Sequence, residues 1–129
     1  RSSVVVGSET DEPEAVRLAG PALGAVALAA STAMASGLPF IIIRGETKEY
    51  GTAKRIEGPF EQGELVCLLE DVVTSGGAAA DAIDDLREAG LECRVAVCVV
   101  DREEGGADAL ARKAVRLHAL FRARDVLES

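Results

Sequence analysis

Apolar residues along this chain gather in short continuous runs, with segments of mixed polarity between them. A short continuous apolar run is typical of a strand that is buried on both faces, as in a parallel sheet. Residues 40–43, 65–69, 94–100 and 115–120 fit this pattern, and residues 4–6 are a shorter example. We therefore predict strands at these positions.

Three of the intervening segments predict helices, at residues 22–36, 78–89 and 106–114. Gly37-Leu38-Pro39 stops the first helix and Gly90 closes the second, because glycine and proline commonly follow a helix end. Residues 45–63 form a long polar connection. Loops of that length inside a compact domain are usually lids, binding loops or disordered segments.

This alternation of strands and helices predicts an α/β fold, a doubly wound and mainly parallel sheet with helices on both faces. The length of 129 residues suits a single domain over residues 1–129, large enough for one hydrophobic core. The chain contains no internal repeat that would suggest a repeat architecture.

Composition limits the classes of protein that remain. Hydrophobic residues make up 48% of the chain, yet no uninterrupted apolar stretch approaches the length of a membrane span, and no signal peptide is visible at the start. Cys67 and Cys98 lie in apolar strand runs, where a reduced, buried thiol is expected. The net charge of −8 argues against non-specific binding of nucleic acid. We expect a cytoplasmic protein that binds neither membranes nor nucleic acid.

The chemistry is concentrated after the strand at residues 65–69. Glu70 and Asp71 follow that strand, and a Thr74-Ser75-Gly76-Gly77 turn leads into the next helix. Ligands of open α/β sheets bind just past the carboxyl ends of strands, and small residues that open a helix let backbone N–H groups surround a phosphate. Adjacent carboxylates would repel the phosphate but can hold sugar hydroxyls or a metal. The stretch predicts a ligand with both a phosphate and a ribose; the alternative is an ordinary strand-to-helix turn with an acidic rim.

Four segments resemble motifs of the type I phosphoribosyltransferases, and specifically of their orotate branch. Residues 65–78 resemble the motif that binds phosphoribosyl pyrophosphate (PRPP), and Leu18 to Ala29 resemble the pyrophosphate loop with its following helix. Arg44 to Gly58 resemble the catalytic loop, which in the family usually reads Arg-Lys-x-x-Lys-x-(His or Tyr)-Gly and runs to Ile-Glu-Gly. Val99 to Gly105 resemble the strand end that carries an orotate-binding arginine. The four segments occur in family order and cover about residues 18–127.

The resemblance implies an enzyme, orotate phosphoribosyltransferase, which transfers the 5-phosphoribosyl group from PRPP to orotate. The products are orotidine 5′-phosphate and pyrophosphate, in de novo pyrimidine (UMP) biosynthesis. The implied catalytic residues are Arg44, Lys48 and Asp71. The residues implied to bind the ribose and phosphate of PRPP are Glu70, Asp71, Val72, Val73, Thr74, Ser75, Gly76, Gly77 and Ala78. Those implied for pyrophosphate are Ala22, Leu23, Gly24, Arg44, Lys48 and Tyr50, and those for orotate are Thr74 and Arg102.

The resemblance also implies a cofactor and an assembly. Mg²⁺ would be held mainly by substrate and water, near Glu70 and Asp71, without direct ligation by side chains. The protein would be a homodimer in which the 45–58 loop acts on the neighbouring subunit. Anionic substrates on an acidic protein need local cations, and the candidates are Arg44, Lys48, Lys54, Arg55 and Arg102. A solvated surface loop with scattered charge is the alternative interpretation of the first four.

Several positions depart from the family pattern. Gly45 stands where many members carry a second basic residue, Gly24 where some carry a lysine, and Ala78 where a hydroxyl residue often ends the phosphate loop. Family members usually have an N-terminal segment, the hood, that covers the base and contributes contacts to orotate. Few residues precede Gly20, so we expect this hood to be short or missing. These departures keep open a PRPP- or nucleotide-binding regulatory protein, or a weakened transferase. A sister transferase for another base is the third alternative, against which the Glu-Tyr-Gly-Thr and Ile-Glu-Gly stretches argue.

Overall fold

The computed structural model describes residues 15–45 and 55–127. One six-stranded sheet with the strand order β3-β2-β1-β4-β5-β6 forms the centre of the molecule. Its strands are β1 (Arg17–Pro21), β2 (Phe40–Ile43), β3 (Ile56–Glu57), β4 (Leu65–Val73), β5 (Glu92–Asp101) and β6 (Arg116–Arg122). The helices are α1 (Val26–Ser36), α2 (Gly77–Glu88), α3 (Gly106–Ala111) and α4 (Ala123–Leu127). The strand expected at residues 4–6 lies outside the described residues.

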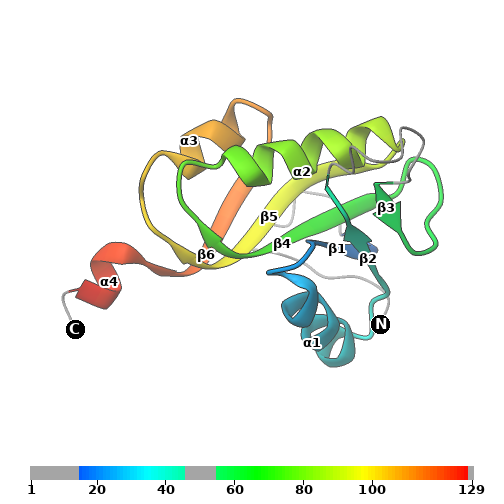
Figure 1. Cartoon of the computed structure of the whole chain (residues 1–129), viewed down its shortest axis with the longest axis horizontal. Coiled ribbons are helices and arrows are strands. Elements are labelled where there is room, and N and C mark those ends of the chain that lie inside the picture. Colours follow the sequence, from blue (N-terminus) through cyan, green and yellow to red (C-terminus); the bar gives the residue numbers. More distant parts are fainter. Residues whose placement is uncertain (1–14, 46–54, 128–129) are drawn as a thin grey trace.

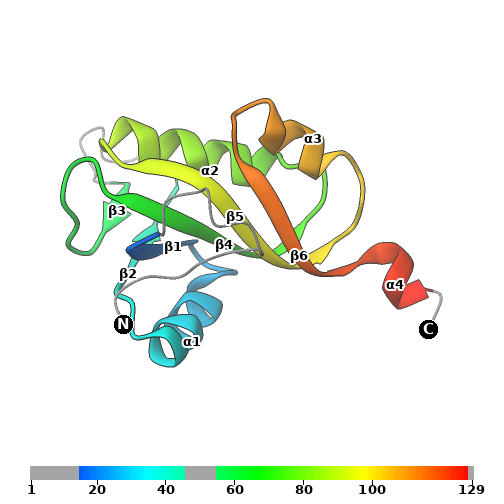
Figure 2. The same cartoon turned by 180° about the vertical axis from the view of Figure 1, so that it is seen from behind.

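The order of the strands confirms the doubly wound, mainly parallel fold. β1 pairs in parallel with β2 on one side and with β4 on the other, and β5 and β6 continue the parallel sheet. β3 is antiparallel to β2. Helices α2 and α3 cover one face of the sheet and α1 lies on the other (Figure 1), as the view from behind also shows (Figure 2). The chain therefore changes winding direction between β1 and β4, which is the point where such sheets bind ligands.

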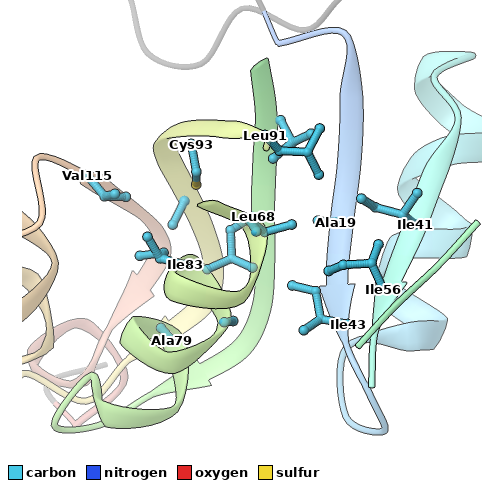
Figure 3. Close-up of a cluster of buried hydrophobic side chains, with 14 of the residues drawn as sticks. Ala19, Ile41, Ile43, Ile56, Leu68, Ala79, Ile83, Leu91, Cys93 and Val115 are labelled. Atoms are coloured by element: carbon cyan, nitrogen blue, oxygen red, sulfur yellow. The ribbon is translucent and has the colours of Figure 1, made fainter. Parts of the chain in front are cut away.

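Two apolar clusters hold the layers together. On the α2 side, Leu68 of β4 packs with Ile83 and Leu86 of α2 in a cluster that reaches from Ile43 to Val115 (Figure 3). A smaller cluster on the other face joins Ala29 of α1 to the sheet. Burying a leucine such as Leu86, which has no exposed surface, stabilises the fold by about 2–5 kcal/mol relative to alanine.

The first strand was not predicted, and the first helix begins later than expected. A helix was expected from residue 22, but residues 17–21 form β1 and α1 begins only at Val26. The run Leu-Ala-Gly-Pro has low intrinsic strand propensity, so its strand depends on pairing with two neighbours. Gly20 lets β1 approach α1 closely, because a Cβ there would lie 2.9 Å from the Ala25 carbonyl oxygen and 2.9 Å from the Ala29 Cβ.

Other predicted boundaries move by a few residues. β2 coincides with its prediction, whereas β4 continues beyond residue 69 to Val73 and so includes the acidic pair. The third helix ends at Ala111 instead of residue 114, and β6 runs on to Arg122. β3 and α4 were not predicted. The three cysteines are buried and free, and among the described residues no helix is long and apolar enough to cross a membrane.

Candidate functional site

Two turns meet where the sheet changes winding direction. β1 and β4 lie side by side, and each leads at its carboxyl end into a turn followed by a helix. After β1 comes the turn of Pro21 to Ala25, and after β4 the turn of Thr74 to Gly76. Gly24 of the first turn lies against the carboxylate of Asp71, so the predicted pyrophosphate and ribose residues share one site.

The two carboxyl groups of the acidic pair Glu70-Asp71 lie in different environments. Successive residues of a strand point to opposite faces, so Glu70 is buried, with 8% of its surface exposed, whereas Asp71 faces solvent. Burial, and then the neighbouring Asp71 charge, raises the pKa of Glu70 to about 7. Oδ1 of Asp71 accepts the Val72 N–H at 2.8 Å, which fixes one side of that carboxylate. Asp71 can accept hydrogen bonds from the hydroxyl groups of a ligand, and Glu70 can hold or release a proton near neutral pH.

The turn after β4 has the form expected of a phosphate cradle. Gly76 adopts φ +91 at the N-cap of α2, a conformation that favours glycine, and it ends the turn without a side-chain cap. The Ser75 hydroxyl accepts the Gly77 N–H at 3.4 Å. Thr74, Ser75, Gly77 and Ala78 are exposed, and a hollow of about 30 Å³ lies beside them. The first N–H groups of a helix have no partner within the helix, so this turn can bind an anion.

Two backbone N–H groups of the turn after β1 are already hydrogen-bonded within the protein. The Ala22 N–H donates to the Ile43 carbonyl at 2.7 Å, and the Ala25 N–H donates to that of Pro21 at 3.1 Å. The peptide bond between Ala22 and Leu23 is cis. Of the three residues predicted to bind pyrophosphate here, Leu23 and Gly24 are the ones whose N–H groups suit a ligand.

The predicted cations that the structure describes, Arg44, Arg55 and Arg102, carry carboxylate partners. Nε of Arg44 lies 2.9 Å from Oε2 of Glu57, across the β2–β3 pair, and both side chains are about half exposed. Nε of Arg102 lies 3.3 Å from Oε2 of Glu104. Both pairs are exposed and therefore weak enough to exchange for a ligand. Lys48 and Tyr50 lie outside the described residues, as does Lys54.

Arg55 belongs to a second group of charges that sequence reasoning missed. Its guanidinium donates to Asp85 of α2 at 2.8 Å, and Asp85 is only 8% exposed. One polar face of α2 lines a pocket of about 470 Å³, together with Ala22 of the turn after β1, Ile43 of β2 and Arg55. The acidic residues lining it are Asp81, Asp84, Asp85 and Glu88. Spacing on α2 could have revealed the acidic cluster, but not its contact with Arg55, which is 30 residues away.

Arg102 is joined to the phosphate turn through its backbone. Its N–H donates to the Val73 carbonyl at 2.9 Å, and Val73 pairs with Asp101 in the sheet. The buried Asp101 carboxylate accepts the Glu103 N–H at 2.8 Å, so it orders the turn after β5. The predicted orotate residue Arg102 and the predicted phosphate residues are therefore neighbours.

The donor atoms for a metal are few in this site. The described residues include no group of three or more His, Cys, Asp or Glu side chains placed to hold a metal ion. This agrees with an Mg²⁺ ion held mainly by substrate and water oxygens, near the carboxylates of Glu70 and Asp71 but without direct ligation by side chains. That arrangement stays a prediction.

Comparisons with known proteins give the chain a family, although no family model matches it. It is 51% identical over 116 residues to the orotate phosphoribosyltransferase of Halobacterium salinarum, an alignment that covers 90% of this chain and 66% of that protein. Against the orotate phosphoribosyltransferase of Haloquadratum walsbyi the identity is 39% over 124 residues, covering 96% and 68%. The chain spans slightly less than two thirds of the length of the first of these relatives.

Solved structures agree with the sequence relatives. The phosphoribosyltransferase from Corynebacterium diphtheriae superposes with a TM-score of 0.78 at 35% identity, covering 87% of this chain and 67% of that one. The Mycobacterium tuberculosis orotate phosphoribosyltransferase in complex with PRPP gives 0.74 at 28% identity, covering 85% and 64%. With this identity, this fold and two adjoining turns that carry the family's motifs, the chain belongs to the orotate phosphoribosyltransferase family.

Proposed function

We propose that this protein transfers the 5-phosphoribosyl group of PRPP to orotate, with orotidine 5′-phosphate and pyrophosphate as products, in de novo pyrimidine biosynthesis. The observation that carries the proposal is the acidic pair Glu70-Asp71 followed by the phosphate turn, where the sheet changes winding direction. Relatives that share this stretch of chain carry the name orotate phosphoribosyltransferase.

The reaction exchanges one bond at the anomeric carbon of the ribose. The bond from that carbon to pyrophosphate breaks, and pyrophosphate leaves with the electron pair. N1 of orotate forms the new bond to the carbon and gives up its proton, which the departing pyrophosphate can accept. Positive charge develops on the sugar between these events, and carboxylates nearby stabilise it. Asp71, which is exposed at the junction of the two turns, would accept hydrogen bonds from the ribose hydroxyls. Glu70 is the buried carboxyl next to it in β4.

The 5-phosphate would bind the turn from Thr74 to Ala78, at the N-terminus of α2. A helix of 12 residues offers its first N–H groups and the positive end of its dipole to an anion. Val72 and Val73 lead into this turn and position it. The hydroxyls of Thr74 and Ser75 are exposed beside it and can donate further hydrogen bonds.

Pyrophosphate leaves with negative charge, so cations and N–H groups should receive it. Leu23 and Gly24 supply backbone N–H groups, and Arg44 would exchange Glu57 for the pyrophosphate. Lys48 and Tyr50 of the 45–58 loop would complete this side. Mg²⁺, held mainly by substrate and water oxygens near Glu70 and Asp71, would neutralise part of the pyrophosphate charge when bound.

Orotate would be selected by its carboxylate. Arg102 presents a planar guanidinium at the end of β5, and an arginine pairs with a carboxylate in bidentate fashion. To do so it must exchange its exposed partner Glu104, which costs little. Thr74 lies at the same edge of the sheet and would contact the base.

A homodimer in the cytoplasm, with Lys48 reaching the neighbouring site, is part of the same proposal. Exposed apolar side chains support a contact with another subunit: 86% of Leu23 in the turn after β1 and 87% of Met34 in α1 are exposed, and α1 carries no charged residue. Dimers with twofold symmetry are the commonest oligomers.

Pyrophosphate release tests the proposed function. It should appear when PRPP, Mg²⁺ and orotate are all present, and not when orotate is omitted or replaced by uracil. Calorimetry with PRPP on wild type and Asp71→Ala adds a binding measurement, for which we expect a loss of about tenfold or more in affinity. PRPP binding without any pyrophosphate release would favour the regulatory alternative, and no binding at all would exclude both.

A further inference from the structure

The turn that binds phosphate in the proposed function packs against a second turn, the one between β5 and α3. Gly106, the first residue of α3, is buried in this contact. Gly76 faces it: a Cβ added at Gly76 would lie 3.0 Å from the Gly106 Cα and 3.2 Å from its carbonyl oxygen. Two glycines therefore meet where the turns cross, and neither has room for a side chain.

The space at Gly106 is bounded by the backbone of the phosphate turn itself. A Cβ there would overlap Cγ1 of Val73, and it would lie 2.9 Å from the Thr74 carbonyl oxygen and 3.6 Å from the Gly76 nitrogen. Val73 is 2% exposed and branched at Cβ, so it cannot rotate away easily. The Thr74 carbonyl can move only with the turn.

The rest of this contact keeps the second turn in place. The Arg102 N–H bonds to the Val73 carbonyl, and Asp101 holds the Glu103 N–H, so the chain is tied down just before Gly105. Gly105 takes φ +100 as the N-cap of α3 and directs Gly106 toward the phosphate turn. A side chain at Gly106 must therefore be accommodated by the phosphate turn or by a shift of α3.

We propose that Gly106 is a positioning residue for the phosphate turn: its lack of a side chain lets Thr74 to Gly76 hold the geometry that receives the 5-phosphate of PRPP. Gly106 does not touch the substrate in this proposal and acts through the backbone of Thr74 and Gly76. The inference rests on the proposed function, because it takes the turn after β4 to be the phosphate site.

Gly106→Ala should weaken binding of ribose 5-phosphate, the probe for this site, by about tenfold or more, since hydrogen bonds to a charged group depend on their geometry. Binding of inorganic pyrophosphate, proposed for the turn after β1, should stay within about twofold. A general loss of stability would weaken both ligands alike. In steady state, KM for PRPP should rise more than kcat falls, because the defect lies in binding of the phosphate.

Ala107→Gly is the matched control. Ala107 is the exposed neighbour on α3, and its replacement by glycine weakens the helix without adding an atom next to the phosphate turn. This variant should bind ribose 5-phosphate like wild type. If Gly106→Ala does not fold, Val73→Ala/Gly106→Ala removes the worst overlap while keeping the contact with the Thr74 carbonyl. It should bind ribose 5-phosphate more weakly than Val73→Ala alone.

Each result decides the proposal. Equal affinity of wild type and Gly106→Ala for ribose 5-phosphate would overturn it and leave the proposed function standing. The same holds if Ala107→Gly loses as much affinity, or if the double variant matches Val73→Ala. If wild type binds neither ribose 5-phosphate nor PRPP, the phosphate site is excluded, and both proposals fall together.

Discussion

The Asp71 carboxylate lies next to the place that a side chain on Gly24 would occupy, although 47 positions separate the two residues in the chain. A Cβ added at Gly24 would lie 3.1 Å from Oδ2 of Asp71 and 3.5 Å from Oδ1. The backbone of Gly24 is not in the left-handed region, so the glycine is needed here for space and not for its conformation. The missing side chain gives the Asp71 carboxylate its place between the two turns.

Gly24→Ala should therefore weaken PRPP binding by displacing Asp71. The carboxylate must give way by a few tenths of an ångström, and we expect a loss of about threefold to tenfold in affinity by calorimetry. Because the alanine keeps the N–H proposed to bind pyrophosphate, the loss should depend on Asp71. In an Asp71→Ala background the same substitution should change the affinity by less than about twofold. Additive losses in the double variant would show that Gly24 acts independently of Asp71.

Arg102→Ala should lose orotate turnover while PRPP affinity stays close to that of wild type. The reason is that the guanidinium is proposed to pair with the orotate carboxylate, a group that uracil lacks. We expect kcat/KM for orotate to fall by about a hundredfold or more, since a charge-assisted pair is lost.

Arg94→Ala is a matched control for that measurement. Arg94 lies at the other end of the same strand and pairs with Glu92 at 3.0 Å, much as Arg102 pairs with Glu104. It should keep full turnover. A fall in PRPP affinity of Arg102→Ala as large as the fall for orotate would assign Arg102 to a different part of the site.

Glu70 should make stability depend on pH. Its folded pKa of about 7 lies above the ordinary value of 4.5, so the folded protein holds the proton more tightly than the unfolded chain does. The contribution of Glu70 to the free energy of unfolding is fully present below about pH 4.5, and it is lost as the pH rises through 7. Above pH 7 the buried charge costs on the order of 2 kcal/mol of unfolding free energy.

Glu70→Gln removes that titration, and denaturant unfolding without Mg²⁺ or substrate measures it. The variant should gain stability relative to wild type between pH 5 and about pH 8, with little change in the difference below pH 4.5. Glu57→Gln, an exposed carboxyl, serves as the comparison. A stability difference between Glu70→Gln and wild type that is the same at every pH would show that Glu70 keeps its ordinary pKa.

Mixing of subunits tests the proposed action of Lys48 on the neighbouring site. Lys48→Ala and Asp71→Ala should each be nearly inactive. If the protein is a dimer with Lys48 acting in trans, a heterodimer of the two has one site lacking both residues and one intact site. Exchange of subunits should then restore up to about a quarter of wild-type activity, since half of the dimers are mixed and each has one working site of two. A mixture that exchanges subunits but stays inactive would place Lys48 in cis or outside the reaction.

Local patterns in the sequence determined the positions of several helices and strands and the motifs of the candidate site. The continuous apolar run of β2 and the period of α2 depend on neighbours in the chain, so both elements lie close to their predicted positions. The acidic pair, the small residues after it and the arginine at the end of β5 likewise form contiguous motifs. From the order and residue content of these motifs, the sequence predicted the family, the parallel sheet and the residues proposed to bind PRPP and orotate.

The tertiary structure decided whatever depends on contacts between distant residues. Strand β1 has weak propensity and forms because two neighbours pair with it. The buried Asp85 carboxylate finds its partner in Arg55, which lies 30 residues away, just before β3. Packing of the turns also determines the space at Gly24 and Gly106, since a side chain at either position would meet a residue far along the chain. A sequence pattern shows which side chains are present. Whether the missing side chain of a glycine matters depends on which distant residue packs against it, and only the folded structure decides that.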